Sequence, residues 1–348
     1  MLQARIEGKW IDTFANVFNL CGVKPGDVAA ILSETQSRAV NVQLAELALL
    51  KLGAKPFHLI APTPPQKVQV PIRSTGASEI IQQSKPMIAA LAQSTFVADC
   101  TVEGLMHAAE LPEILKGGAR VLYVSNEHPE SLERMTSTPE LEAKVKIGIK
   151  MLRGAKQMRV VSPAGTDLTI NVEGAAVGGI WGYTARPGTL AHWPGGLCLC
   201  FPKPNSVNGR VVLAPGDVNL TFKRYMETPV TLVVKDDYVE KIDGTGLDAE
   251  LMRSYISAWG DREAYAVSHV GWGMNKGARW DAMTMYDRND FNGSELRAFA
   301  GNFLYSTGAN EVAKRYTLGH FDLPMRHCTV SLDGKNVVAD GVLQGELA

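Results

Sequence analysis

The chain has 348 residues, of which 45% are hydrophobic and 20% are charged. This composition is that of an ordinary globular protein and excludes a disordered chain, a collagen and a small disulfide scaffold. The 35 basic and 36 acidic residues give a net charge of -1, which argues against nucleic acid or an anionic membrane surface as a partner. At roughly 150 residues per domain, the length predicts about two domains.

We expect no targeting segment in this sequence. Its first twenty residues lack the apolar stretch and cleavage site of a secretory signal peptide. No run of about 18 apolar residues is present, so we expect no membrane-spanning helix. Five scattered cysteines are consistent with unpaired thiols in a reducing compartment, and we therefore expect a cytoplasmic protein.

Strand and helix signals alternate through the first half of the chain. Short apolar runs predict strands at residues 28–32, 55–60, 96–100 and 120–124. Helical periodicity and end signals predict helices at residues 37–52, 86–93, 110–116 and 130–153, the last broken near Pro139. Such alternation predicts a Rossmann-like domain with a parallel wound sheet over residues 1–158. It contains neither a GxGxxG nor a P-loop pattern, so no nucleotide is expected there.

The texture changes at about residue 159, where short strands separated by turns replace the alternation. Strands are expected at residues 158–162, 167–172, 210–213, 217–222 and 230–234. One clear helix is expected at residues 247–259. These signals predict a mixed, mostly antiparallel α+β domain over residues 159–348, so that the whole chain combines an α/β and an α+β unit.

His320 and Asp322 stand two residues apart in a segment that reads as extended. In a strand, side chains at this spacing share one face, about 6.5–7 Å apart along the chain, while the intervening Phe321 faces the packing. An imidazole and a carboxylate so placed can converge on one metal. A hydrogen-bonded His–Asp pair without a metal fits the same spacing. Pro324 suits the edge or the end of a strand.

His269 lies where a strand-like run leads into a Gly-rich segment, which we expect to be a turn. With His320 and Asp322 it has the composition of a 2-His-1-carboxylate triad. Three ligands on one face leave three positions of an octahedral Fe(II) open for substrate and O2. A structural zinc site would need four ligands, usually with cysteine, and no cysteine here has such spacing.

Six segments in the same order resemble those of the 2,5-dihydroxypyridine 5,6-dioxygenases, enzymes of bacterial nicotinate breakdown. These segments span residues 191–196, 268–273, 278–280, 286–290, 297–308 and 320–326. The resemblance is strongest from about residue 192 to residue 333 and is looser, but collinear, before that. The family is related to a group of metal-dependent aminopeptidases, so the fold alone does not fix the reaction.

The resemblance implies a ligand set of His269, His320 and Asp322 for Fe(II). The implied reaction uses O2 to open a hydroxylated pyridine ring between carbons 5 and 6, giving N-formylmaleamate. The resemblance also implies a homo-oligomer.

The resemblance further implies that His107 and His192 are catalytic and that Met106 joins them in binding the substrate. One departure concerns residues 175–191, which include no acidic residue, although the family has a carboxylate there. Ile180 stands near that place, and the change alters the polarity expected for the pocket.

Two other classes of protein fit parts of the sequence. The first is a two-metal aminopeptidase of the related group, which needs several carboxylates, yet Glu173 is the only acidic residue between Leu168 and Gly216. The second is a non-catalytic ligand-binding protein. A group of charged residues either orients the ligands or forms structural ion pairs, and for most of them we favour the structural interpretation. The group comprises Arg279, Asp287, Arg288 and Asp290.

Overall fold

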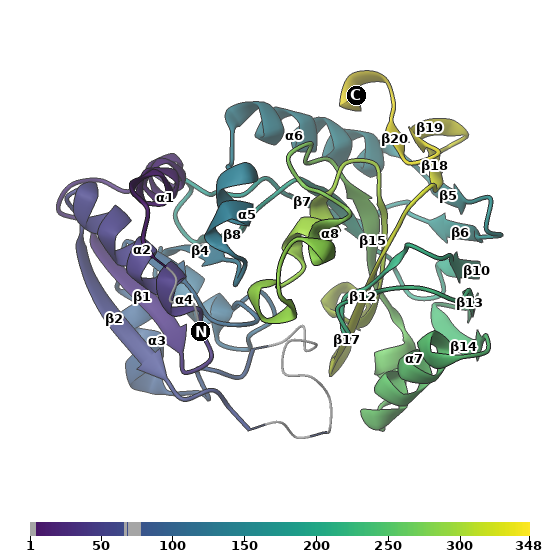
Figure 1. Cartoon of the computed structure of the whole chain (residues 1–348), viewed down its shortest axis with the longest axis horizontal. Helices are drawn as coiled ribbons and strands as arrows, with labels where there is room; N and C mark the ends of the chain where they lie inside the picture. The colour runs from purple at the N-terminus through teal and green to yellow at the C-terminus, as the bar shows by residue number, and fades with distance from the viewer. Residues whose placement is uncertain (1–4, 66–67, 69–77) are drawn as a thin grey trace.

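The computed structural model describes residues 5–65, 68 and 78–348. Figure 1 shows two halves, a parallel sheet with helices on one side of the molecule and antiparallel sheets on the other. The predicted combination of a wound α/β sheet with a mostly antiparallel α+β unit is therefore confirmed. No helix in the described ranges is long and apolar enough to cross a membrane.

The five-stranded parallel sheet has the order β2-β1-β3-β4-β8. In that order its strands are Lys55–Ala61, Val28–Glu34, Phe96–Asp99, Arg120–Val124 and Thr189–Trp193. Strand β8 lies beyond residue 158 and pairs in parallel with β4. The division of the chain at residue 158 stays a prediction, and this sheet draws on sequence from both sides of it.

Helices cover both faces of the parallel sheet. Alternate strand residues point to opposite faces, and because they are apolar on both, each face must be buried. Ile31 packs with α1 and α2, whereas Ala30 and Leu32 pack with α3 and α4. No helix was expected where α1 lies. The helices of this half are α1 (Gly8–Leu20), α2 (Ala39–Lys51), α3 (Lys85–Ala92), α4 (Leu111–Lys116) and α5 (Pro129–Arg134). The next helix, α6 (Pro139–Gly154), packs on the antiparallel half, where Val145 and Leu152 join the core.

Two antiparallel sheets share one apolar core in the other half. The larger sheet consists of β14 (Tyr238–Asp243), β13 (Val230–Lys235), β10 (Val207–Leu213), β6 (Asp167–Asn171), β5 (Gln157–Val161), β18 (Thr329–Leu332), β19 (Lys335–Ala339) and β20 (Val342–Leu343). The smaller sheet consists of β17 (Arg315–Met325), β16 (Phe303–Asn310), β15 (Val267–Gly273), β9 (Leu197–Phe201) and β7 (Ala176–Ile180).

Shorter elements complete this half. They are the pair β11 (Val218–Asn219) and β12 (Arg224–Tyr225), helices α7 (Leu247–Ala258) and α8 (Ser294–Ala298), and helical turns at Arg262–Tyr265, Ala282–Thr284, Arg288–Asp290, Glu311–Ala313 and Gly345–Leu347. The strand expected at residues 217–222 is reduced to the two residues of β11. All five cysteines are buried and unpaired, in keeping with the expectation of free thiols.

Strands β7 and β9 were not anticipated, and in β7 the strand signal of the sequence is weak. Glycines occupy two positions of β7, and glycine has a low preference for strands. Gly179 is there for space, since a Cβ atom on it would lie 2.4 Å from Cγ1 of Val145 on α6. Close packing of α6 on the sheet therefore requires glycine at this position, and that glycine weakens the strand signal in the sequence.

Candidate active site

Two imidazoles and one carboxylate meet at the edge of the smaller antiparallel sheet. Asp322 Oδ1 lies 3.3 Å from His320 Nε2 and 3.8 Å from His269 Nε2. One ligand atom from each residue falls within 4.8 Å of the other two. The three residues singled out from the sequence are thus brought together, although His269 is separated from the other two by about fifty positions.

Strand β17 aligns two members of this triad as expected. His320 and Asp322 both line the cavity described below, whereas Phe321 is fully buried in the core between the sheets. Strand β17 is the edge of its sheet, and Pro324 is its penultimate residue. An edge position tolerates the missing N–H of proline, so this prediction is confirmed.

His269 reaches the triad from a strand and not from a turn. Residues Val267–Gly273 form β15, which is buried throughout, so the expected Gly-rich turn is wrong. The glycines serve close packing of strands, because a Cβ atom on Gly271 would lie 2.0 Å from the carbonyl oxygen of Cys198. A register shift between Val267 and Val270 marks a bulge at His269, and bulges re-aim side chains next to active sites.

Hydrogen bonds hold the Asp322 carboxylate on both oxygens. Ser306, its cross-strand neighbour on β16, donates to Oδ1, and Arg297 Nε donates to Oδ2 at 2.5 Å. Burial alone would raise the pKa of Asp322, but His320 and Arg297 outweigh burial and hold that pKa well below its usual value. The carboxylate is therefore ionised and fixed in orientation, as a metal ligand must be.

His107 and His192 come from the parallel-sheet half and face the triad. His192 lies on β8 with its ring 4.9 Å from that of Tyr123, and the ring of His107 lies 6.1 Å from that of His320. Burial lowers the pKa of His107 to about 4 and that of His192 to about 3, with smaller contributions from nearby charges. Both imidazoles are therefore neutral, and each has a ring nitrogen that can accept a hydrogen bond.

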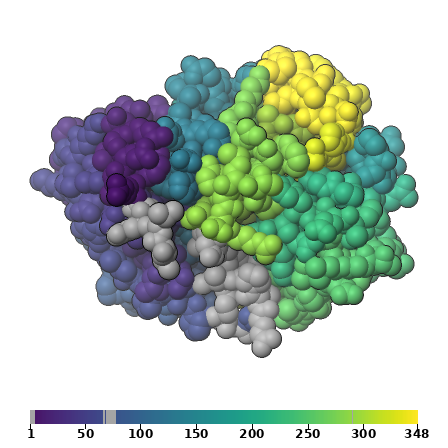
Figure 2. Space-filling view, viewed as in Figure 1, coloured from purple at the N-terminus to yellow at the C-terminus, as the bar shows by residue number. Residues whose placement is uncertain are grey.

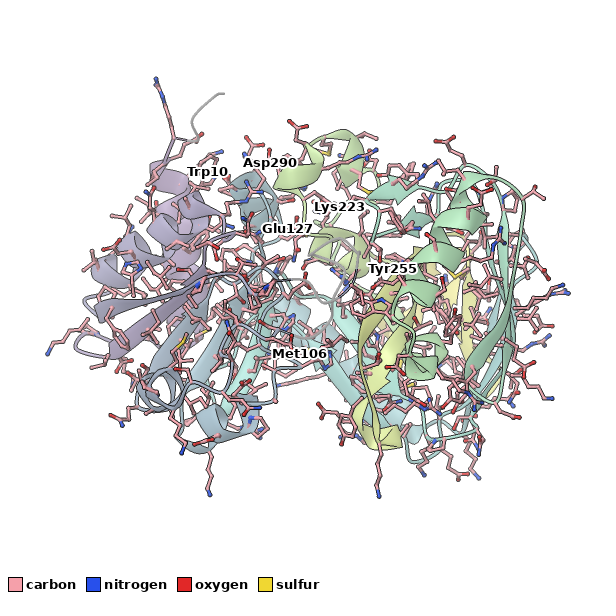
Figure 3. The ribbon with its side chains drawn as sticks, turned by 90° about the horizontal axis from the view of Figure 1, so that it is seen from below. Trp10, Met106, Glu127, Lys223, Tyr255 and Asp290 are labelled. Atoms are coloured by element: carbon pink, nitrogen blue, oxygen red, sulfur yellow. The ribbon has the colours of Figure 1, made fainter. Side chains whose placement is uncertain are left out.

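One cavity of about 110 Å³ joins all these side chains. Its wall includes the five predicted polar residues and Met106, which Figure 3 places between the two halves. A cavity of roughly 150 Å³ admits benzene, so this volume is on the scale of one small ring and not of a larger ligand. The apolar part of the wall consists of Met106, Ile180, Pro194, Leu197, Leu199, Phe201, Leu220 and Leu304. His58, His128 and His327 do not belong to this wall.

Several polar residues of the cavity were not singled out from the sequence. They are Glu103, Tyr123, Thr221, Asn292, Ser294 and Arg297. No spacing pattern marks them, since each lies in a loop, a short helix or a strand far from the triad in sequence. Arg297 does stand at the head of one of the segments that carried the family resemblance.

Two of the four charged residues singled out at residues 279–290 form ion pairs, each with a partner outside that set. Arg279 pairs with Asp281 at 2.8 Å, and Asp290 pairs with Arg38 of the other half at 2.6 Å. Neither Arg279 nor Asp290 lies on the cavity wall. The structural interpretation of these residues therefore fits their surroundings.

A Rossmann-like sheet joined to an antiparallel unit, with a His-His-Asp group in a ring-sized cavity between them, defines an α/β enzyme with a candidate metal site. A family model described as 2,5-dihydroxypyridine 5,6-dioxygenase (NicX) matches residues 9–345. The 2,5-dihydroxypyridine 5,6-dioxygenase of Pseudomonas putida is 34% identical over 332 residues, which are 94% of each chain. The chain belongs to this family.

Solved structures agree with this assignment. The 2,5-dihydroxypyridine dioxygenase of Pseudomonas putida superposes with a TM-score of 0.91 and 33% identity, over 97% of this chain and 98% of that one. AmpT of Thermus thermophilus superposes with a TM-score of 0.65 over 97% of this chain and 99% of its own, at 14% identity. At that identity the likeness to AmpT concerns the fold alone.

Proposed function

We propose that this chain opens the ring of 2,5-dihydroxypyridine between C5 and C6 with O2, and that its cofactor is Fe(II) bound by His269, His320 and Asp322. The observation that carries the proposal is the convergence of two imidazoles and one carboxylate on a ring-sized cavity. Membership of the family and the identity of the Pseudomonas putida relative as a 2,5-dihydroxypyridine 5,6-dioxygenase support the substrate and the reaction.

The side chains present fit a ferrous ion. Two imidazoles and one carboxylate are the donor set of non-haem Fe(II) oxygenases. Burial lowers the pKa of His269 to about 3, which leaves its imidazole neutral and able to donate an electron pair. Among the described residues, no other His, Cys, Asp or Glu joins this group. Fe(II) there would supply Lewis acidity, electron transfer to O2 and open coordination positions.

The cavity walls bind and orient the ring. Leu199, Phe201 and Ile180 belong to the apolar wall, and the three triad residues line the same cavity. Apolar side chains around a flat ring exclude water and fix its plane, so that the 5-hydroxyl can be directed toward the triad. Met106 belongs to the same apolar wall.

Two neutral imidazoles are placed to accept and return the protons of the reaction. His192 Nε2 is buried, and no hydrogen-bond partner for it exists in the part of the chain that the structure describes. A ring hydroxyl would satisfy that nitrogen and give up its proton to an imidazole. His107 and His192 are the two candidates, one to accept the hydroxyl proton and the other to return a proton as the O–O bond breaks.

The atoms of the reaction balance without any further reactant. Both atoms of O2 enter the product, the C5–C6 bond breaks, C5 becomes a carboxylate and C6 becomes the formyl group on nitrogen. Four electrons leave the ring and reduce O2, so no external reductant is needed.

An oxygen electrode tests the proposal with Fe(II)-loaded protein and 2,5-dihydroxypyridine. We expect one O2 consumed per ring and N-formylmaleamate as the product. Asp322→Ala should lose both iron and turnover, whereas His192→Ala should keep its iron and lose turnover by about 100-fold or more. His327→Ala is the matched control, because this histidine is 60% exposed and lies outside the cavity. Full turnover in Asp322→Ala would remove that residue from the ligand set.

A further inference from the structure

The loop between β3 and α4 is built around a buried carboxylate. Asp99 is fully buried, and its Oδ1 accepts hydrogen bonds from the Thr101 hydroxyl at 2.6 Å and the Thr101 N–H at 3.1 Å. Its Oδ2 accepts from the Leu105 N–H at 2.8 Å. These bonds fix the loop that carries Glu103, and it runs on to Met106 and His107.

The two residues that flank Glu103 are held as well. The Val102 N–H donates to Glu34 Oε1 at 2.6 Å, and the Val102 carbonyl accepts from the Tyr123 hydroxyl at 2.7 Å. Gly104 has a φ of +74°, and a Cβ atom there would lie 2.8 Å from the Tyr123 ring. Glu103 therefore stands on a rigid backbone, which lowers the entropic cost of presenting its carboxylate to a ligand.

Glu103 and Asp322 are the two carboxylates of the cavity wall among the described residues. Asp322 belongs to the triad and is bound by Ser306 and Arg297. Glu103 is the other, and its charge acts on Tyr123 and Arg297. Burial raises the pKa of Tyr123, with a further rise from Glu103; burial would lower the pKa of Arg297, but Asp322 and Glu103 outweigh it.

This part of the wall thus offers an anionic acceptor close to a cationic donor. Arg297 uses Nε on Asp322, and its planar fork carries four more N–H groups. A 2-hydroxypyridine ring in its pyridone form presents an N–H donor beside a C=O acceptor. The acceptor of Glu103 and the donors of Arg297 complement that pair.

We propose that Glu103 determines substrate specificity by accepting the ring N–H of the pyridone form of 2,5-dihydroxypyridine. This inference rests on the proposed function and names the group that recognises the nitrogen side of the ring. A benzene-1,4-diol has the same size and both hydroxyls but no ring N–H. Binding it would lose the hydrogen bond from the ring N–H to Glu103, and sites built to bind an N–H reject such analogues strongly.

The test measures anaerobic dissociation constants for 2,5-dihydroxypyridine and benzene-1,4-diol by calorimetry on the Fe(II)-loaded full chain. We expect Glu103→Leu to weaken pyridine binding by about 10- to 100-fold and to reduce the preference over the diol by the same factor. Glu103→Gln keeps an acceptor but loses the charge, so its loss should be smaller, about 3- to 10-fold. Glu113→Leu makes the same change at an exposed glutamate of α4 outside the cavity wall and should leave the preference unchanged.

Iron content and thermal melting establish that each variant is folded and loaded. A preference that stays within about twofold of wild type in Glu103→Leu would overturn the inference. Should that variant fail to fold, the same unchanged preference in Glu103→Gln would overturn it. O2 uptake by the wild type is measured separately. Its absence would refute the proposed function, whereas the ratio of dissociation constants reports on Glu103 alone.

Discussion

At the scale of single residues, the site depends on how one carboxylate is held. Asp322 is 4% exposed and makes hydrogen bonds to Arg297 and Ser306 while facing two imidazoles. A buried anion is tolerated only when cations and donors surround it. Arg297 therefore has two roles, as counter-charge for the candidate metal ligand and as part of the cavity wall.

Removal of this counter-charge should destabilise the protein. We expect Arg297→Met to lower the free energy of unfolding by about 3 kcal/mol, because breaking a buried pair leaves an uncompensated charge. Arg279→Met is the matched control, since Arg279 and its partner Asp281 are 52% and 30% exposed. That change should stay within about 0.5 kcal/mol. Urea unfolding at neutral pH measures both, and equal effects would contradict the role given to Arg297.

Some residues of the site can be recognised from the sequence by their chemistry and spacing, whereas others take their role only from tertiary packing. His320 and Asp322 could be found from spacing, because period-two placement on a strand is a local property. His269 could be proposed only as a third donor of the right type. Glu103 and Arg297 could not be found, because their role arises from a loop and a short helix that meet only when the two halves pack together.

At the scale of elements, the position of His269 depends on how closely β15 approaches β9. Gly271 faces the backbone of Cys198, as described above, and a methyl group there has no space. Gly178 on β7 is also a strand glycine, yet a Cβ atom on it would meet nothing within 4 Å. Substitutions at these two glycines therefore distinguish the effect of adding a side chain to a strand from the effect of forcing two strands apart.

We expect Gly271→Ala to cost about 3 kcal/mol of stability and to lower iron affinity, because β15 must move and carry His269 with it. Gly178→Ala should be neutral or slightly stabilising, by up to about 0.5 kcal/mol. Thermal melts with and without Fe(II) measure both quantities. Equal iron binding in the two variants would show that β15 does not set the position of the triad.

The loop after β3 should confer a pH dependence on stability. Burial raises the pKa of Asp99 from 3.8 to about 6 in the folded chain, against the effect of its hydrogen bonds. Between pH about 4 and pH about 6 the folded state then holds a proton that the unfolded state has lost, so stability falls as the pH rises. The loss amounts to about 3 kcal/mol at pH 7.

Asp99→Asn should lack this component. Subtracting its unfolding free energy from that of the wild type at a series of pH values isolates the component, and urea unfolding at each pH measures it. Parallel curves across this window would show that Asp99 does not titrate there.

The elements themselves could be predicted to different degrees. The alternating half was predicted well, because buried parallel strands are continuous apolar runs and their helices end at clear signals such as Gly53. Strand β7 and most of β15 were not, because Gly179 and Gly271 are present for close packing and give no strand signal. Tertiary contacts override local preference at those positions.

At the scale of the whole molecule, one segment connects the halves. Residues 287–298 belong by sequence to the antiparallel half, yet they reach the parallel-sheet half. Asp290 pairs with Arg38 and Glu295 pairs with Arg134, both at 2.6 Å. Figure 2 shows this light-green chain between the purple and the teal parts on one face. The same segment supplies Arg297 to the cavity, so docking of the halves and completion of the site are coupled.

Glu127 is the main clamp of this segment. It is fully buried, and its carboxylate accepts the N–H groups of Asn292, Gly293 and Ser294 at 2.8, 2.8 and 2.7 Å. Figure 3 shows Glu127 between the two halves, near Asp290. Because backbone N–H groups that lose a buried acceptor are costly, the clamp should control both stability and the shape of the cavity.

We expect Glu127→Ala to cost about 3 kcal/mol or more, since three donors lose their acceptor, and to raise the KM for the ring about tenfold as Asn292 and Ser294 shift. Glu127→Gln keeps one acceptor oxygen and should cost about half as much. The exposed Glu130 on α5 gives the control, Glu130→Gln, with no change expected. Amide hydrogen exchange distinguishes the clamp from general destabilisation. In Glu127→Ala the amides of residues 292–294 should exchange before the core of the parallel sheet does, and uniform loss of protection across both halves would contradict the clamp.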